Sequence, residues 1–171
     1  YFGLKLYASA VDDLTAVLHF KKDDAEALEN RGLAYLAMND YGRAIDDFDT
    51  LVDLRPSSPN PLRERCFAHA ASGHDLDDAL EDCSKALALK ANDPAALDAR
   101  CFVQFRKAAY AAAIADCTAA LAAQPKLASS LYLRGLAKKK SGDAAGAAAD
   151  LAAASALDPA IADTYANYGV R

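Results

Sequence analysis

The sequence predicts an all-α fold, a right-handed solenoid built from stacked helical hairpins. Apolar residues make up 53% of the 171 residues, while glycine and proline contribute only 8 and 6, a composition that favours helices around a core. A unit of about 34 residues recurs along the chain, which indicates stacked repeats. Small residues return at fixed positions within each unit, where the two helices of a hairpin have to cross closely.

One arginine per unit shows the period of the repeat. It stands at Arg31, Arg65, Arg100 and Arg134, so the spacings are 34, 35 and 34 residues. The next residue is always small: Gly32, Cys66, Cys101 and Gly135. A second small residue follows later in each unit, at Ala44, Ala79, Ala113 and Ala147. A single helical hairpin cannot bury its apolar stripe alone, so units in register are expected to stack on one another.

The units divide the chain in order. Residues 1–24 fit a truncated unit, and full units are expected at 25–58, 59–93, 94–127 and 128–161. Turn signals lie where the first helix of a unit has to end, in "ND" at 39–40, "SGHD" at 72–75 and "SGD" at 141–143. Asp93 and Pro94 are typical of an N-cap and a first helical residue. Residues 162–171 are expected to begin a terminal helix, so that one array spans 1–171.

This pattern resembles the tetratricopeptide repeat, and the resemblance covers the whole chain. Each unit of that family consists of a helix, a turn and a second helix. Counted from the start of a unit, positions (slots) 8 and 20 hold small residues and slot 32 holds proline. Their large apolar slot 4, often tryptophan in the family, is leucine here: Leu28, Leu62, Leu97 and Leu131. Proline closes three units, at Pro56, Pro125 and Pro159. The resemblance implies a superhelix whose concave face is lined by the first helix of each unit.

A column of aspartates accompanies the column of arginines. The aspartates follow the arginines by 16 or 17 residues, at Asp47, Asp82, Asp116 and Asp150. The arginine slot adjoins the helix crossing and the aspartate slot lies one turn beyond it, so the two columns are expected to face each other. We therefore predict charge-assisted structural pairs: Arg31 with Asp47, Arg65 with Asp82, Arg100 with Asp116, and Arg134 with Asp150. The alternative is a row of arginines for anionic ligands.

Four cysteines fall at inward-facing slots: Cys66, Cys83, Cys101 and Cys117. We expect them to pack as small apolar side chains, because their spacing follows the repeat. The alternative, a pair of disulfides, applies if the protein is exported. His69 and His74 lie between Cys66 and Cys83, but this set lacks the close cysteine pairing of zinc sites. We therefore expect no metal site, and we expect His69 to fill the core.

Charge and motifs argue against several classes of function. A net charge of −5 disfavours a nucleic-acid binder, which needs a basic surface. The sequence has no glycine-rich phosphate loop and no nucleophile elbow, so neither enzyme activity nor a cofactor is expected. No apolar run approaches the ~18 residues of a membrane helix, so a soluble protein is expected. The cytoplasm is the default compartment, and export stays open because the chain begins partway through a unit. The alanine-rich composition without tryptophan is typical of a GC-rich bacterial source.

The concave face is the expected binding site. The residue at slot 9 of each full unit is apolar, and charged residues flank it. This arrangement is typical of protein interaction sites. The predicted partner-binding residues are Glu29, Asn30, Leu33, Arg63, Phe67, Phe102, Phe105, Arg106, Tyr132, Leu136, Lys139 and Lys140. The alternative is that the phenylalanines only pack between adjacent first helices.

We therefore expect a non-enzymatic scaffold that binds a peptide or helix of a partner protein in its concave groove. The docked helix can also be the chain's own terminal segment or a second copy. Two other functions stay open, a regulatory or substrate-docking array of a larger enzyme and a self-associating array. Self-association is favoured by the uneven charge, −7 over residues 1–90 and +2 over residues 91–171.

Overall fold

A computed structural model describes residues 2–170, with side chains described from Leu6 onward. Within these residues all regular structure is α-helical. The helices are α1 (Phe2–Phe20), α2 (Ala25–Ala37), α3 (Tyr41–Leu54), α4 (Pro59–Ser72), α5 (Leu76–Leu89), α6 (Pro94–Arg106), α7 (Tyr110–Ala123), α8 (Ala128–Lys140), α9 (Ala144–Leu157) and α10 (Ile161–Asn167). Tyr1 and Arg171, the ends of the predicted array, lie outside the described residues.

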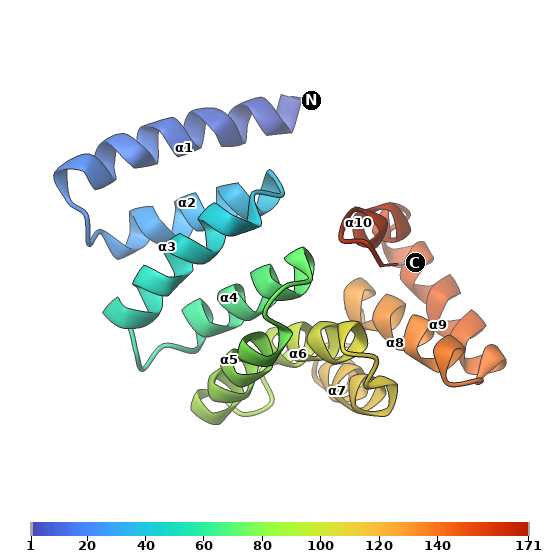
Figure 1. Ribbon diagram of the computed structural model, residues 1–171. Coiled ribbons are helices and arrows are strands. Elements are labelled where there is room, and N and C mark those ends of the chain that lie inside the picture. The colour runs from blue at the N-terminus through green and yellow to red at the C-terminus, as the bar shows by residue number, and fades with distance from the viewer. Residues whose placement is uncertain (1, 171) are drawn as a thin grey trace.

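The helices form hairpins that stack in an arc (Figure 1). α2 pairs with α3, α4 with α5, α6 with α7 and α8 with α9, and each hairpin also contacts the next. Helix α1 packs on α2 at one end of the arc, while α10 contacts α8 at the other. The side of α4, α6 and α8 that faces α10, called the inner side below, lies opposite α5 and α7. The predicted all-α solenoid is thereby confirmed.

Helix ends follow local chemistry. The side chains of Asp24, Asp40 and Asp143 cap the first turns of α2, α3 and α9 by accepting backbone N–H hydrogen bonds. Gly73 ends α4 with φ of 80°, a left-handed conformation that costs glycine little. Asp93 stands at the N-cap of α6 as predicted, yet its carboxylate accepts from Nζ of Lys90 instead of capping the backbone.

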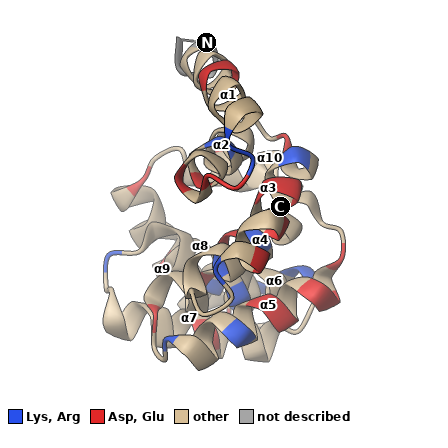
Figure 2. Ribbon diagram, turned by 90° about the vertical axis from the view of Figure 1, so that its left-hand side faces the viewer, with Lys and Arg blue, Asp and Glu red and all other residues tan. Residues whose placement is uncertain are grey.

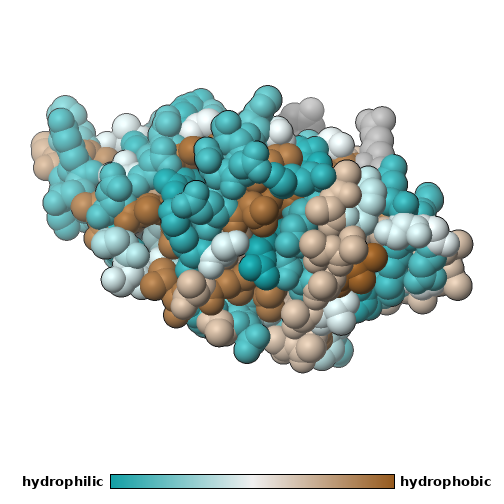
Figure 3. All heavy atoms as spheres, turned by 60° about the horizontal axis from the view of Figure 1, so that its bottom comes forward, coloured by the Kyte–Doolittle hydropathy of each residue, from teal (hydrophilic) through white to brown (hydrophobic). Residues whose placement is uncertain are grey.

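The outer surface carries both signs of charge. Acidic and basic residues are interspersed over the helices and do not form one basic stripe (Figure 2). Seen from the side of α5 and α7, hydrophilic side chains alternate with brown hydrophobic patches and a band of moderately apolar side chains (Figure 3). No helix within residues 2–170 has both the length and the apolar character needed to cross a bilayer.

The cysteines depart from the prediction, because they form two disulfides, Cys66–Cys83 and Cys101–Cys117. The small slot of the first helix and the apolar slot of the second meet where the helices of a hairpin cross. Cysteines in both slots therefore have Cα atoms 5.7 and 5.5 Å apart, within the range that a disulfide requires. The expectation of reduced, separately packed thiols is corrected. With both thiols oxidised, Cys66 and Cys83 also cannot act as thiolate ligands.

The two hairpins without a disulfide fill the same crossing with a glycine and a large side chain. A Cβ on Gly32 would lie 2.6 Å from Cε1 of Phe48, and a Cβ on Gly135 would lie 2.8 Å from Cγ of Leu151. Glycine therefore allows a whole phenylalanine or leucine into the crossing. Each hairpin thus has either a glycine with a large partner or a disulfide at the same place.

Replacing Gly32 with alanine is expected to lower the free energy of unfolding by about 1–3 kcal/mol. The ring of Phe48 is fully buried, so moving it away from a new Cβ would disturb the packed core. Gly42 of α3 is the matched control, since a Cβ there meets nothing within 4 Å. Gly42→Ala is expected to stabilise by about 0.5–1 kcal/mol through helix propensity. Urea unfolding measures both, and a Gly32→Ala protein as stable as the native chain would contradict the close crossing.

Candidate functional site

The structure brings together all four predicted arginine–aspartate pairs. In each pair, Nε and Nη2 of the arginine donate to the two carboxylate oxygens at 2.6–2.9 Å. The four aspartates are only 3–7% exposed. The hydrogen bond to the aspartate is the largest cause that raises the pKa of each arginine.

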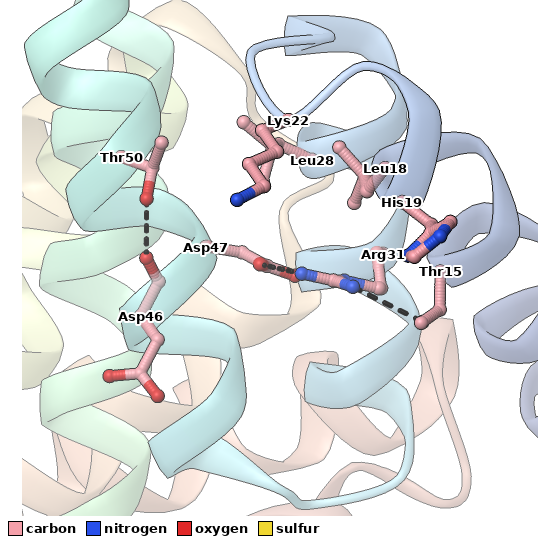
Figure 4. A pocket seen from close by; sticks show the side chains of 9 residues that line it. All are labelled: Thr15, Leu18, His19, Lys22, Leu28, Arg31, Asp46, Asp47 and Thr50. Atoms are coloured by element: carbon pink, nitrogen blue, oxygen red, sulfur yellow. Dashed lines mark hydrogen bonds and ion pairs between the residues drawn. The ribbon is translucent and has the colours of Figure 1, made fainter.

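Three of these arginines also donate a hydrogen bond to the helix that precedes their own hairpin. Figure 4 shows Arg31 of α2 between Asp47 of α3 and Thr15 of α1, whose Oγ1 accepts from Nη1 at 3.1 Å. The equivalent third contacts are Arg65 to Asp49 and Arg134 to Thr118. These hydrogen bonds connect each of the three hairpins to the helix that precedes it.

The alternative of an anion-binding arginine row finds no support in this geometry. Arg31 does line a cavity of about 450 Å³ between α1, α2 and α3, together with His19 and Lys22 (Figure 4). However, its Nε, Nη1 and Nη2 already donate to Asp47 and Thr15. The guanidinium is therefore engaged within the protein.

Two adjoining cavities share Leu33 of α2 in their lining, and the smaller of them also borders α4 and α6. One, of about 620 Å³, lies between α1 and α2 and includes Tyr7, Leu14 and Asn30. The other, of about 320 Å³, lies among α2, α4 and α6 and is bordered by Leu127. Leu33 is 42% exposed, so apolar surface is accessible where the two cavities meet. The surface of these two cavities is called the open groove below.

Four other predicted residues lie in or beside the open groove. Asn30 lines the larger cavity, and Arg63 and Phe67 line the smaller one. Glu29 is held at its side by an ion pair with Arg55, with Nη1 of the arginine 3.0 Å from Oε2. Together with Leu33, these residues place apolar surface beside charged groups, as the sequence predicts for a binding face.

The far half of the inner side is covered by α10. Tyr165 packs on Phe102 and Tyr132, with ring centroids 5.2 Å apart in both contacts. Tyr168, directly after the helix, lies 5.8 Å from the rings of Phe67 and Phe102. The chain's own terminal segment therefore occupies this part of the concave face, as one of the sequence alternatives proposes.

The structure corrects this part of the predicted site. Phe102, Phe105, Tyr132 and Leu136 are 1–8% exposed, so a partner cannot touch them while α10 is docked. Phe105 packs on Tyr110 of its own hairpin, with ring centroids 5.7 Å apart. Only Phe67, half-buried at the border of α10 and the open groove, still presents surface among the phenylalanines of the predicted site.

Arg106 is also a structural residue, contrary to the prediction. Its Nε and Nη2 donate to the carbonyl oxygens of Ala70 and Ala71, at 2.9 and 3.2 Å, in the last turn of α4. A cation in this position satisfies carbonyls that lack helical partners and complements the helix dipole. The remaining predicted cations, Lys139 and Lys140, are exposed at the end of α8, and neither lines the open groove.

Two carboxylates of the open groove are absent from the predicted partner-binding set. Glu64 of α4 and Asp98 of α6 both line the smaller cavity. Burial raises the pKa of Glu64, and burial also raises the pKa of Asp98. Both lie on the first helix of a unit, which the resemblance assigns to the concave face. This position in the unit could have identified them as groove residues from the sequence.

Known proteins share the fold of this chain. A family model described as tetratricopeptide repeat matches residues 25–58. No curated protein matches the sequence. MamA residues 41 to the end, from Desulfovibrio magneticus RS-1, is similar over 92% of this chain and 96% of that chain, at 19% identity and a TM-score of 0.71.

Two further solved structures have the same arrangement. PilW, described as a widely conserved type IV pilus biogenesis factor, aligns over 94% of this chain and 79% of its own, at 17% identity and a TM-score of 0.78. YrrB, described as a TPR protein with an unusual peptide-binding site, aligns over 91% and 79%, at 17% identity and a TM-score of 0.66. At these identities the likeness concerns the fold alone.

Proposed function

The chain is a tetratricopeptide-repeat solenoid, and we propose that it binds a segment of a partner protein in the open groove between α1 and α6, without catalysing a reaction. The observation that carries this proposal is Leu33, which stands 42% exposed between two cavities of about 620 and 320 Å³. Cavities of this size accept side chains, so adjoining cavities suit successive residues of a peptide.

Charge beside the apolar surface supports this reading. Asp13 and Asn30 line the larger cavity, while Arg63, Glu64 and Asp98 line the smaller one. An apolar surface rimmed by polar groups is typical of interaction sites, because apolar anchors supply affinity and polar groups supply specificity. YrrB, a structure with the same fold, is described as having a peptide-binding site, which agrees with this use of the fold.

The two disulfides favour an oxidising compartment for this protein. Structural disulfides persist in exported proteins, whereas cytosolic thiols are kept reduced. Both bridges lie inside hairpins, between cysteines that are fully buried. We therefore place the proposed partner outside the cytoplasm.

Replacing Leu33 with aspartate is expected to weaken binding of a groove ligand at least tenfold, because a charge would stand where apolar contact is needed. Ligands are selected from a random peptide library displayed on phage, and their dissociation constants are measured by fluorescence anisotropy. Leu157→Asp is the matched control, since Leu157 is 44% exposed at the end of α9, away from the groove. A library that yields no binder, or equal weakening by both variants, would refute the proposed function.

A further inference from the structure

The smaller cavity of the open groove contains more negative than positive charge. Its charged lining consists of Arg63, Glu64 and Asp98. One guanidinium therefore faces two carboxylates. The remaining walls include the apolar side chains Leu33, Leu36, Phe67 and Leu127. The cavity, of about 320 Å³, thus combines apolar walls with two carboxylates.

Glu64 has one oxygen that is left without a partner. Its Oε1 accepts from Nη2 of Arg63 at 2.9 Å, whereas Oε2 is buried and has no hydrogen-bond partner among the described residues. The residue is only 7% exposed. An unpaired buried carboxylate oxygen is costly, and most such atoms in proteins are satisfied by some donor. The nearby charge of Glu29 adds to the effect of burial in raising the pKa of Glu64.

Among the described residues, the side-chain donors to Asp98 are both neutral. Its two oxygens accept from the hydroxyl groups of Ser129, at 2.8 Å, and Ser130. These hydrogen bonds stabilise the ionised form but only partly offset burial, so the pKa stays raised. The serines orient the carboxylate without neutralising it.

We propose that this cavity receives a lysine side chain of the partner segment, with the ammonium group at Glu64 Oε2 and Asp98. The methylene groups of the lysine would pack against Leu33, Phe67 and Leu127, as amphipathic side chains do when only their ends are charged. The ammonium would provide the missing donor and balance the excess negative charge. This inference rests on the proposed function and specifies which residue the partner brings.

Lysine suits the cavity better than arginine. A guanidinium binds a carboxylate best through two parallel hydrogen bonds to both oxygens. In Glu64 one oxygen is already occupied by Arg63, so only Oε2 is free. A compact ammonium needs only a single oxygen from a carboxylate, and Glu64 and Asp98 line the same cavity.

Small probes test the cavity without knowledge of the partner. The ¹⁵N-labelled chain is titrated with n-butylammonium, which mimics a lysine side chain, and separately with n-butanol and n-butylguanidinium. We expect n-butylammonium to shift amide signals around Glu64 and Phe67, and to bind about tenfold more tightly than n-butanol. Equal binding of n-butanol, or no binding of n-butylammonium at the groove, would overturn the inference.

Two variants connect these shifts to the free oxygen. Glu64→Gln retains the shape and removes the charge, so binding of n-butylammonium should fall about tenfold. Glu81→Gln is the matched control, because Glu81 is exposed on α5 and forms an ion pair with Lys85, and binding should be unchanged. Circular dichroism checks that both variants are folded. Unchanged binding to Glu64→Gln would count against the inference.

The selected peptides separate the two proposals. Enrichment of lysine over arginine, lost when the selection is repeated with Glu64→Gln, supports both. Peptides that depend on Leu33 but show no lysine preference would overturn the lysine site and leave the proposed function intact. Glu64-dependent binding of n-butylammonium with no selectable peptide would support the lysine site and refute the proposed function.

Discussion

Replacing Asp116 with alanine is expected to lower the free energy of unfolding by about 3–5 kcal/mol. Nε and Nη2 of Arg100 each donate to this carboxylate at 2.7 Å, and Asp116 is only 7% exposed. Loss of the carboxylate leaves a partly buried guanidinium, on a side chain that is 26% exposed, without its side-chain hydrogen bonds among the described side chains. Urea unfolding followed by circular dichroism measures the change.

Asp49→Ala provides the control for this prediction. Asp49 also accepts from an arginine, with Oδ1 at 2.8 Å from Nη1 of Arg65, but its side chain is 54% exposed. Its removal should cost less than about 1 kcal/mol, because exposed ion pairs contribute little. Arg100→Met combined with Asp116→Ala should recover part of the lost stability, since both buried charges are then absent. If Asp116→Ala and Asp49→Ala lower the free energy of unfolding equally, burial does not determine how much an arginine–aspartate pair contributes to stability.

Reduction of the disulfides is expected to lower the free energy of unfolding by about 3 kcal/mol for each bridge. The bridges join residues 17 and 16 positions apart, and closing loops of this length restricts the unfolded chain. Unfolding in urea with and without tris(2-carboxyethyl)phosphine measures the difference.

A chain with all four cysteines replaced by alanine controls for other effects of the reductant, because its unfolding should not respond. Thiol titration in denaturant gives a direct count, with no free thiol expected before reduction and four afterwards. Four reactive thiols in the untreated protein would contradict the disulfides and restore the expectation from sequence of separately packed cysteines.

The hairpins could be predicted from sequence because their determinants are local and repeated. Arg31, its small neighbour Gly32 and Asp47 recur as a set, and each set describes one helix crossing. Four copies make the register unambiguous, so the arginine partners could be named. The contact from Arg31 to Thr15 could not, because stacking between hairpins depends on their tertiary arrangement.

The disulfides could also have been predicted from the repeat. Cys66 and Cys83 occupy the two slots that meet at the crossing, where Gly32 meets Phe48 in the first hairpin. When each slot is considered alone, its cysteine is expected to pack as a small apolar residue. When the two slots are considered as a contacting pair, their cysteines are expected to form a disulfide.

The site was harder to predict because α10 lies over it. A repeat pattern indicates which faces are inner but not what covers them. Ile161, Tyr165 and Tyr168 recur at helical spacing and form an apolar stripe, which indicates a helix that packs on something. Its position against Phe102 and Tyr132 depends on the path of the chain after Pro159, for which the repeat offers no rule.

The central claim is that the open groove, and not the covered half of the inner side, receives a partner segment. Methyl NMR spectra of the chain with a selected peptide test this claim most directly. Signals of Leu33, Leu36 and Leu127 should shift, while those of Leu89 and Leu157 on second helices stay in place. Shifts confined to Leu89 and Leu157, or release of Tyr165 from Phe102 with Leu33 unchanged, would contradict the account.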